Sequence, residues 1–453
     1  MIRRNALAVT GTLALWSAIL VASAALADGI PPRFAVTPLE SLEGGSTKAY
    51  ALNDAGQSTG ESGTGSIVVG YHAFVGSDDG SIEDIETLEG FDISEGRSIN
   101  SSGQVAGTLT YFPGQQGVGT IFRYSPGLGM VEFGTLGGTW GSVVDMNESG
   151  DVAGSWATAG GDTHAFLYTD QEGLVDLGTL GTYESRVRDV NDAGQVVGYS
   201  WTEDWDIHAF LWEDGVMQDL GTLGGDSSDA YYINADGVVV GTSTAADGSS
   251  RGFRYTQGGG MEALPSLSGM TSCTASWITD SGMITGWWQD GARQLAFCYT
   301  EAEGMIDLGV DLGATAWTGP VAANDAGEIL LWAMDDQTYE VYAIYYSPET
   351  GAHDLNDLLV TELDWRIDQP VDINEAGQIV ASGFDVNHYN SVLLTPVTPG
   401  DLDGDGHVDL SDLAELLAHY GATSGATYGQ GDIDADGDVD IGDLAELLGV
   451  YGT

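Results

Sequence analysis

The chain has little cysteine, little positive charge and, after its first residues, no long apolar run. Cys273 and Cys298 are its only cysteines, which excludes a scaffold built on disulfides. Lys and Arg total 12 against 68 Asp and Glu, so the formal net charge is −56. A charge of this sign repels phosphate backbones and anionic membrane surfaces. We therefore expect no nucleic-acid partner.

The N-terminus predicts export. Arg3 and Arg4 precede an apolar run from about Ala6 to Ala22, and Ala25-Leu26-Ala27 provides the small residues of a cleavage site. We predict a signal peptide over residues 1–27. No later segment approaches the roughly 18 apolar residues of a membrane helix. The expected location is extracellular or at the cell surface, without membrane insertion.

A phrase such as DVNDAGQVVG recurs eight times, and its Asn or Thr serves as an anchor. The anchors are Asn53, Asn100, Asn147, Asn191, Asn234, Thr279, Asn324 and Asn374. Their spacings are 47, 47, 44, 43, 45, 45 and 50 residues, which gives a period of about 45. The Asn can bond backbone two residues on, and the following Gly can take positive φ. We interpret the anchors as turn residues rather than ligands.

Each repeat contains four short extended pieces, which we call A to D, separated by Gly, Asn and Asp. Four strands per repeat of this length predict an all-β fold, an eight-bladed β-propeller over residues 28–397. The first D piece precedes the first anchor and would complete the last blade, leaving no free edge. An open β-solenoid is the alternative. The two cysteines fall on non-adjacent strands of one blade, farther apart than a disulfide usually permits, so we expect free thiols, with a single bridge as the alternative.

The sequence His-Ala-Phe begins at His72, His164 and His208, inside piece C. With the D pieces, it makes residues 34–397 resemble the HAF-repeat family of extracellular repeat proteins, which implies no established activity. No histidine has metal-ligand spacing to another. We expect these histidines to be structural.

Composition changes near residue 398, and the module over residues 398–453 contains no Lys or Arg. Two loops 31 residues apart have Asp at positions 1, 3, 5, 9 and 12 and Gly at position 6. This is the EF-hand spacing, in which alternating oxygens converge on one hard cation. We predict two Ca²⁺ ions. The predicted ligands are Asp401, Asp403, Asp405, the His407 carbonyl, Asp409, Asp412, Asp432, Asp434, Asp436, the Asp438 carbonyl, Asp440 and Asp443.

A helix is expected after each loop. One face of the first helix would carry Leu413, Leu416, Leu417 and Tyr420, and one face of the second would carry Leu444, Leu447, Leu448 and Tyr451. Paired loop-helix units with Asp at position 12 resemble a type I dockerin. The resemblance implies calcium binding, a cohesin-like partner and frequent attachment to secreted polysaccharide-degrading enzymes. It assigns recognition to loop positions 10 and 11, here Leu410-Ser411 and Ile441-Gly442. These depart from the frequent Ser-Thr pair, which places cohesin docking in more doubt than calcium binding.

Tryptophan is concentrated in the D-to-A and B-to-C connections, which emerge on one face of a propeller. Nine tryptophans map to these connections or their edges: Trp140, Trp156, Trp201, Trp205, Trp287, Trp288, Trp317, Trp332 and Trp365. Trp156, Trp201, Trp205, Trp287 and Trp332 are the candidate ligand face. Aromatic rings stack on apolar sugar faces while nearby carboxylates accept hydroxyl hydrogen bonds, so a glycan is the candidate ligand. The alternative is that many of these rings pack between blades.

The chain lacks GxSxG, HExxH and phosphate-loop motifs, and no catalytic residue is predicted. The leading hypothesis is a secreted, non-catalytic binding or scaffold protein attached to a partner through its C-terminal module. The alternative is a polysaccharide-degrading enzyme, a glycoside hydrolase or lyase, suggested by the dockerin resemblance alone. Hydrolysis of O-glycosyl bonds is the expected reaction in that case. A third hypothesis is a cell-surface component held by the module.

Overall fold

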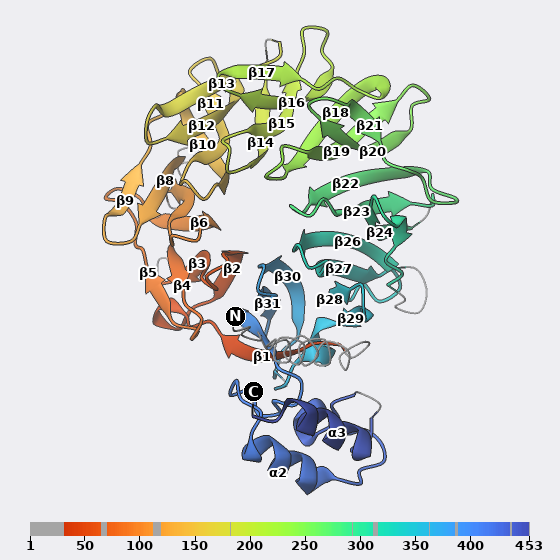
Figure 1. Cartoon of the computed structure of the whole chain (residues 1–453). Coiled ribbons are helices and arrows are strands. Elements are labelled where there is room, and N and C mark those ends of the chain that lie inside the picture. The colour runs from red at the N-terminus through yellow and green to blue at the C-terminus, as the bar shows by residue number, and fades with distance from the viewer. Residues whose placement is uncertain are drawn as a thin grey trace, which may run out of the picture.

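The chain is mostly β, and its strands form a repeated series of four-stranded sheets around a common centre (Figure 1). The computed structural model describes residues 31–64, 70–111, 119–181, 183–291, 293–310, 316–361, 363–385, 388–434 and 437–452. The predicted signal peptide and Asp436 lie outside them. Within the described residues there are six four-stranded sheets and one eight-stranded sheet, in which Ile207 and Ser227 join two repeats. The predicted propeller-type fold of four-stranded repeats is confirmed.

The four strands of each repeat follow the order A, B, C and D across its sheet. The A strands are β2 (Thr47–Leu52), β6 (Ile93–Ile99), β10 (Gly137–Met146), β14 (Ser185–Val190), β18 (Gly224–Ile233), β22 (Ser272–Ile278), β26 (Ala316–Ala323) and β30 (Ile367–Ile373). The B strands are β3 (Ser58–Gly63), β7 (Val105–Thr110), β11 (Val152–Thr158), β15 (Val196–Trp201), β19 (Val239–Ala245), β23 (Ile284–Gln289), β27 (Ile329–Asp335) and β31 (Ile379–Phe384).

The C strands are β4 (Tyr71–Gly76), β8 (Gly119–Ser125), β12 (Thr163–Thr169), β16 (Ile207–Glu213), β20 (Ser250–Thr256), β24 (Gln294–Thr300), β28 (Val341–Ser347) and β32 (Tyr389–Val397). The D strands are β5 (Ile82–Asp84), β9 (Gly129–Glu132), β13 (Gly173–Gly178), β17 (Val216–Asp219), β21 (Gly260–Ala263), β25 (Gly304–Asp307), β29 (Gly351–Asp354) and β1 (Arg33–Pro38). Short 3-10 helices are η1 (Leu42–Gly44), η2 (Leu355–Leu358) and η3 (Tyr428–Gln430).

The first strand completes the last repeat, as the sequence predicts. β1 pairs antiparallel with β32 along its whole length, from Arg33 opposite Val397 to Pro38 opposite Val392. The first and last repeats also meet through the Asp372 carboxylate, which accepts a hydrogen bond from the Leu52 amide at 2.9 Å. These contacts are expected for a propeller and not for an open solenoid.

The anchor asparagines connect neighbouring repeats as well as forming turns. Each Nδ2 donates to the carbonyl oxygen of the next anchor: Asn53 to Asn100 (2.7 Å), Asn100 to Asn147 (3.4 Å), Asn147 to Asn191 (3.1 Å), Asn191 to Asn234 (3.0 Å), Asn234 to Thr279 (3.2 Å), Asn324 to Asn374 (3.1 Å) and Asn374 to Asn53 (3.0 Å). The side-chain oxygen meanwhile accepts turn amides, as Asn191 does from Ala193 and Gln195. We call this the anchor ladder.

The glycine that ends the recurring phrase is required by close strand packing. A Cβ on Gly198 would lie 1.9 Å from the Arg186 carbonyl oxygen, and five other repeats have Gly at this position. The remaining two repeats have Leu331 and Ala381 there, each opposite a proline of strand A.

Replacing Gly198 with Ala is therefore expected to destabilise the propeller by about 3 kcal/mol, because the backbone of β14 or β15 must shift. Urea unfolding followed by tryptophan fluorescence measures the change. Gly160→Ala is the matched control, since its Cβ would meet its nearest atom at 3.6 Å. Equal stability of the two variants would contradict the packing explanation.

The C-terminal module packs against the seam between β1 and β32. Its helices are α2 (Leu410–His419) and α3 (Ile441–Val450). Val360 and Val397 of the propeller pack on its small core, and the Arg33 guanidinium lies 5.2 Å from the centre of the Tyr428 ring. In Figure 1 the module with both helices lies below β1, outside the ring of sheets. No helix among the described residues is long and apolar enough to span a membrane.

Candidate functional site

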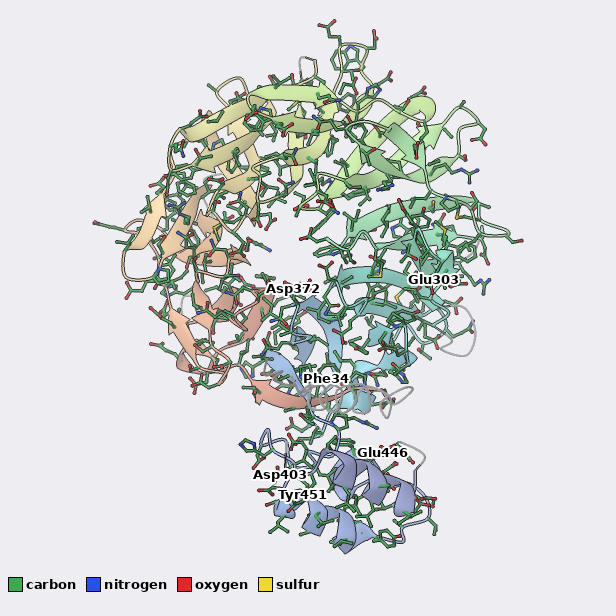
Figure 2. The ribbon with its side chains drawn as sticks, viewed as in Figure 1. Phe34, Glu303, Asp372, Asp403, Glu446 and Tyr451 are labelled. Carbon is green, nitrogen blue, oxygen red and sulfur yellow. The ribbon has the colours of Figure 1, made fainter. Side chains whose placement is uncertain are left out.

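The acidic loops bring their carboxylates together, as the spacing predicts. In the first loop, oxygen atoms of Asp401, Asp403 and Asp405 lie within 4.8 Å of one another. In the second loop, the same holds for Asp432, Asp434 and Asp443, and for Asp438, Asp440 and Asp443. Hard oxygen donors in this arrangement suit Ca²⁺. Figure 2 shows Asp403 and Glu446 on the module.

The twelfth residue of each loop joins the loop to its helix. Asp412 accepts from the Leu402 and Asp409 amides, both at 2.7 Å, and its side chain is 1% exposed. Asp443 accepts equivalently from Ile433 (2.6 Å) and Asp440 (2.8 Å). Asp409 and Asp440 in turn cap the helices. Two carboxylate oxygens carry about four acceptor positions, so these bonds leave room for an ion.

Glu446 is an acid near the second loop that the sequence interpretation missed. Burial, with the charges of Asp434 and Asp443, raises its pKa to about 6. Its Oε2 is buried without a hydrogen bond. The corresponding residue of the first helix, Glu415, instead pairs with His419. His407 lies in the first loop, where its amide donates to Asp405 at 2.9 Å.

The two helices expose matching apolar side chains. The pairs are Leu410 and Ile441 (71% and 65% exposed), Leu417 and Leu448 (54% each), and Tyr420 and Tyr451 (46% and 41%). Leu416 and Leu447 are fully buried, so the single face expected from the sequence is divided between core and surface. The short helices carry more apolar residues than one small core can cover. Leu410 and Ile441, the residues at position 10 of the two loops, belong to this exposed set.

Among the candidate tryptophans, the structure exposes one strongly. Trp205 is 65% exposed, whereas Trp201, Trp287 and Trp332 are half-buried. Trp156 is fully buried, and its inclusion in the ligand face is wrong. Its ring occupies the space beside Gly141, whose missing Cβ would lie only 2.0 Å from Trp156 Cε3. This ring packs inside its repeat, as the alternative interpretation proposed.

Trp201, Trp205 and Tyr183 form one aromatic group. Their ring centres are 5.9 to 6.4 Å apart. Trp205 has a φ of 69°. It lies in a turn closed by a hydrogen bond of 3.2 Å, which the Trp205 amide donates to the Thr202 carbonyl oxygen. A left-handed, exposed tryptophan is strained, and such strain is concentrated at functional positions.

The structure also contains a cavity that the sequence interpretation missed. It has a volume of about 570 Å³ and is lined by A strands of all eight repeats. Every A strand has a register shift that leaves one residue, three before the anchor, without a partner in strand B. These bulge residues are Tyr50, Arg97, Val144, Arg188, Tyr231, Ser276, Val321 and Val371, and all of them line the cavity.

Three carboxylates lie at the next position of the A strands. Asp145 accepts from the Ser98 hydroxyl at 2.8 Å, and Asp189 from the Ile233 amide at 2.8 Å. Burial and the neighbouring Asp145 charge raise the pKa of Asp189 well above its usual range. Burial raises the pKa of Asp372 to about 7. Figure 2 places Asp372 at the inner rim of the ring.

The signal for these acids is present in the sequence. They occur in Asp-X-Asn triplets, as in Asp145 to Asn147, Asp189 to Asn191 and Asp372 to Asn374. The Asn was recognised as recurrent, but Asp at this position alternates with Ala, Ser, Tyr and Trp in the other repeats. A residue that varies between repeats has no periodic signal of its own.

The His-Ala-Phe histidines have partners that fit a structural role. Nδ1 of His72, His164 and His208 lies 2.9 Å from Asp84, Asp176 and Asp219, respectively, which links strands C and D. The cysteines are free and buried, on β22 and β24. Cys273 Sγ accepts a hydrogen bond from the Gly252 amide at 3.0 Å. Ser228, at the equivalent position of another repeat, accepts in the same way from the Ala209 amide through its Oγ. Burial raises the pKa of both thiols, that of Cys298 to about 11.

No family model and no curated protein matches the chain. Among solved structures, the Dos1 propeller is 10% identical, with 80% of this chain and 95% of that chain covered and a TM-score of 0.48. The β-propeller domain of the Trilobed protease from Pyrococcus furiosus is 9% identical (71% and 98% covered, TM-score 0.43). A prolyl endopeptidase is 12% identical (75% and 53% covered, TM-score 0.47), so the chain spans about half of its length. At these values the similarities carry no functional argument.

Proposed function

We propose that the protein is an exported, calcium-binding scaffold protein: an eight-bladed propeller with a dockerin-like module that attaches it to a partner. The observation that carries this proposal is the convergence of three carboxylates within 4.8 Å in each acidic loop. Asp401, Asp403, Asp405 and Asp412 would hold one Ca²⁺, and Asp432, Asp434, Asp440 and Asp443 the other. Each ion would neutralise carboxylates that otherwise repel one another.

The exposed apolar pairs of α2 and α3 are the proposed partner surface. Large apolar side chains exposed together on a small module mark an interaction site. Because equivalent residues of the two helices are exposed, the surface has an internal near-symmetry, and a cohesin-like protein is the expected class of partner. The Trp201, Trp205 and Tyr183 group is the proposed site for a glycan on the propeller rim.

The partner proposal is tested with a Leu417→Asp, Leu448→Asp double variant. Wild-type protein, immobilised in Ca²⁺, is expected to retain a purified cohesin domain from a panel, and chelator should release it. The double variant should bind at least about tenfold more weakly, since two central apolar contacts become charged. Leu128→Asp, at an 86%-exposed leucine on the propeller, is the matched control. Retention that is independent of calcium, or equal in the double variant, would contradict the proposal.

The enzyme alternative is tested separately with a glycan panel, by scoring retention and reducing-end release. If reducing ends are released by the wild type but not by a Glu203→Gln or Asp206→Asn variant of the propeller rim, the protein is a hydrolase and the scaffold proposal is wrong. Retention without release supports the scaffold.

A further inference from the structure

We propose that the central cavity is a binding site for a neutral, hydroxyl-rich ligand, a mono- or disaccharide or the end of a glycan chain. This site differs from the Trp-rich rim and does not depend on calcium binding by the module. It is formed by bulge residues, whose chemistry differs from repeat to repeat although their backbone position is the same.

The bulges direct side chains toward the axis. A bulge leaves one residue out of the ladder and reorients its side chain, which is why bulges are common beside binding sites. All eight bulge residues line one cavity of about 570 Å³, a volume in the usual range of about 300–1,000 Å³ for small-molecule sites. If the bulges served the fold alone, one residue type could occupy most repeats, as Asn does at seven of the eight anchors.

Four of the five polar bulge residues form two matching pairs. Arg97 lies over the Tyr50 ring at 4.6 Å, and Arg188 lies over the Tyr231 ring at 5.2 Å. Val144 lies between the two pairs, and Val321 and Val371, from neighbouring strands β26 and β30, form an apolar wall beside Tyr50. The cavity therefore combines hydrogen-bond donors and aromatic rings with an apolar wall. This combination suits a sugar, whose hydroxyl groups and C–H faces need both.

The two arginines that line the cavity are paired with carboxylates, which disfavours an anionic ligand. Arg97 pairs with Glu95, and Arg188 pairs with Asp229 at 2.9 Å. Each guanidinium has five N–H donors, more than one carboxylate can accept. Asp145, Asp189 and Asp372 also line the cavity, and each accepts a hydrogen bond. An anion would meet these acids and the net charge of −56, while a cation would meet two guanidinium groups and carboxyl groups whose pKa is raised by burial.

A stacked aromatic pair in the cavity supports this assignment. The rings of Tyr232 and Trp277 are stacked 4.0 Å apart, and both residues line the cavity and a second space of about 290 Å³ beside the anchors. Burial and the charge of Asp189 raise the pKa of Tyr232. A ligand in the cavity would change the surroundings of Trp277, which provides a fluorescence signal.

The test uses full-length protein and a panel of glucose, galactose, mannose, xylose and their β-1,4-linked disaccharides, with galacturonate and glucosamine as charged probes. Saturable binding of at least one neutral sugar is expected by fluorescence and saturation-transfer NMR, with a Kd of about 1 mM. Arg188→Gln should weaken it by about tenfold or more, because a charged donor is lost. Arg254→Gln, which removes an outer ion pair with Glu301, is the matched control.

Val321→Phe fills the apolar wall and provides a second variant that leaves the ion pairs intact; thermal melting confirms that each variant is folded. Loss of binding in both cavity variants supports the proposal. Absence of saturable binding by every neutral sugar at about 20 mM overturns it, since this exceeds the expected Kd about twentyfold. Tighter binding of a charged probe also overturns it. So does binding that survives both cavity variants but is lost in Trp205→Ala, which would place the sugar on the rim.

Discussion

Chelation of calcium is expected to abolish the helical circular dichroism of α2 and α3 while the propeller remains folded. The module has one small core, centred on Leu416, Tyr428 and Leu447, and its loops bring at least three carboxylates together. Without an ion, their repulsion opposes the compact loop. A free Ca²⁺ concentration about 100 times the dissociation constant stabilises the folded module by about 2.7 kcal/mol per ion.

The control for this prediction separates ion binding from general charge. Asp403→Asn with Asp434→Asn should reproduce the effect of chelator in the presence of calcium, because both change loop ligands that do not cap the helices. Glu203→Gln, an exposed acid of the propeller, should leave the helical signal unchanged. A helical signal that is insensitive to chelator would show that calcium does not order the module.

Replacing Asn191 with Thr is expected to destabilise the propeller by about 2 kcal/mol. The substitution keeps an oxygen for the turn amides but removes the Nδ2 donor, so the buried Asn234 carbonyl loses its 3.0 Å bond. The chain contains the corresponding natural arrangement at Thr279. Its hydroxyl oxygen accepts a hydrogen bond from the Met283 amide at 3.2 Å. Among the described residues, the Thr279 side chain donates no hydrogen bond to the Asn324 carbonyl.

The reciprocal substitution gives this prediction its strongest control. Thr279→Asn should complete the anchor ladder and stabilise the protein by about 1 kcal/mol. Urea unfolding monitored by tryptophan fluorescence measures both variants. If Asn191→Thr were neutral, or if Thr279→Asn destabilised the protein, the anchors would act only as turn residues within their own repeats.

Sequence periodicity predicted those features that repeat. The anchors, the four strands per repeat and the completion of the last sheet by β1 all follow from a phrase that occurs eight times. The convergence of the loop carboxylates was also predictable, because Asp residues at alternating positions with Gly between them are typical of a loop whose side chains turn toward one point. The anchor ladder was missed, since a bond between Asn191 and Asn234 joins residues that no local pattern relates.

Burial and side-chain direction were the least predictable. Trp156 and Trp201 both occupy the strand B region, yet one ring lies under a glycine of the adjacent strand and the other contacts an exposed aromatic group. The bulge residues Tyr50 and Arg97 differ in type, and only the three-dimensional ring brings them together. The cavity could not be predicted, because its bulge residues are about one repeat apart in the sequence and differ in residue type.

The most direct test of the proposed calcium-dependent module is a calorimetric titration of the full-length, calcium-depleted protein. We predict binding of two Ca²⁺ ions. Asp403→Asn should remove or strongly weaken one site, and Asp434→Asn the other. Binding of no calcium, or binding of two ions unchanged by both substitutions together, would contradict the account.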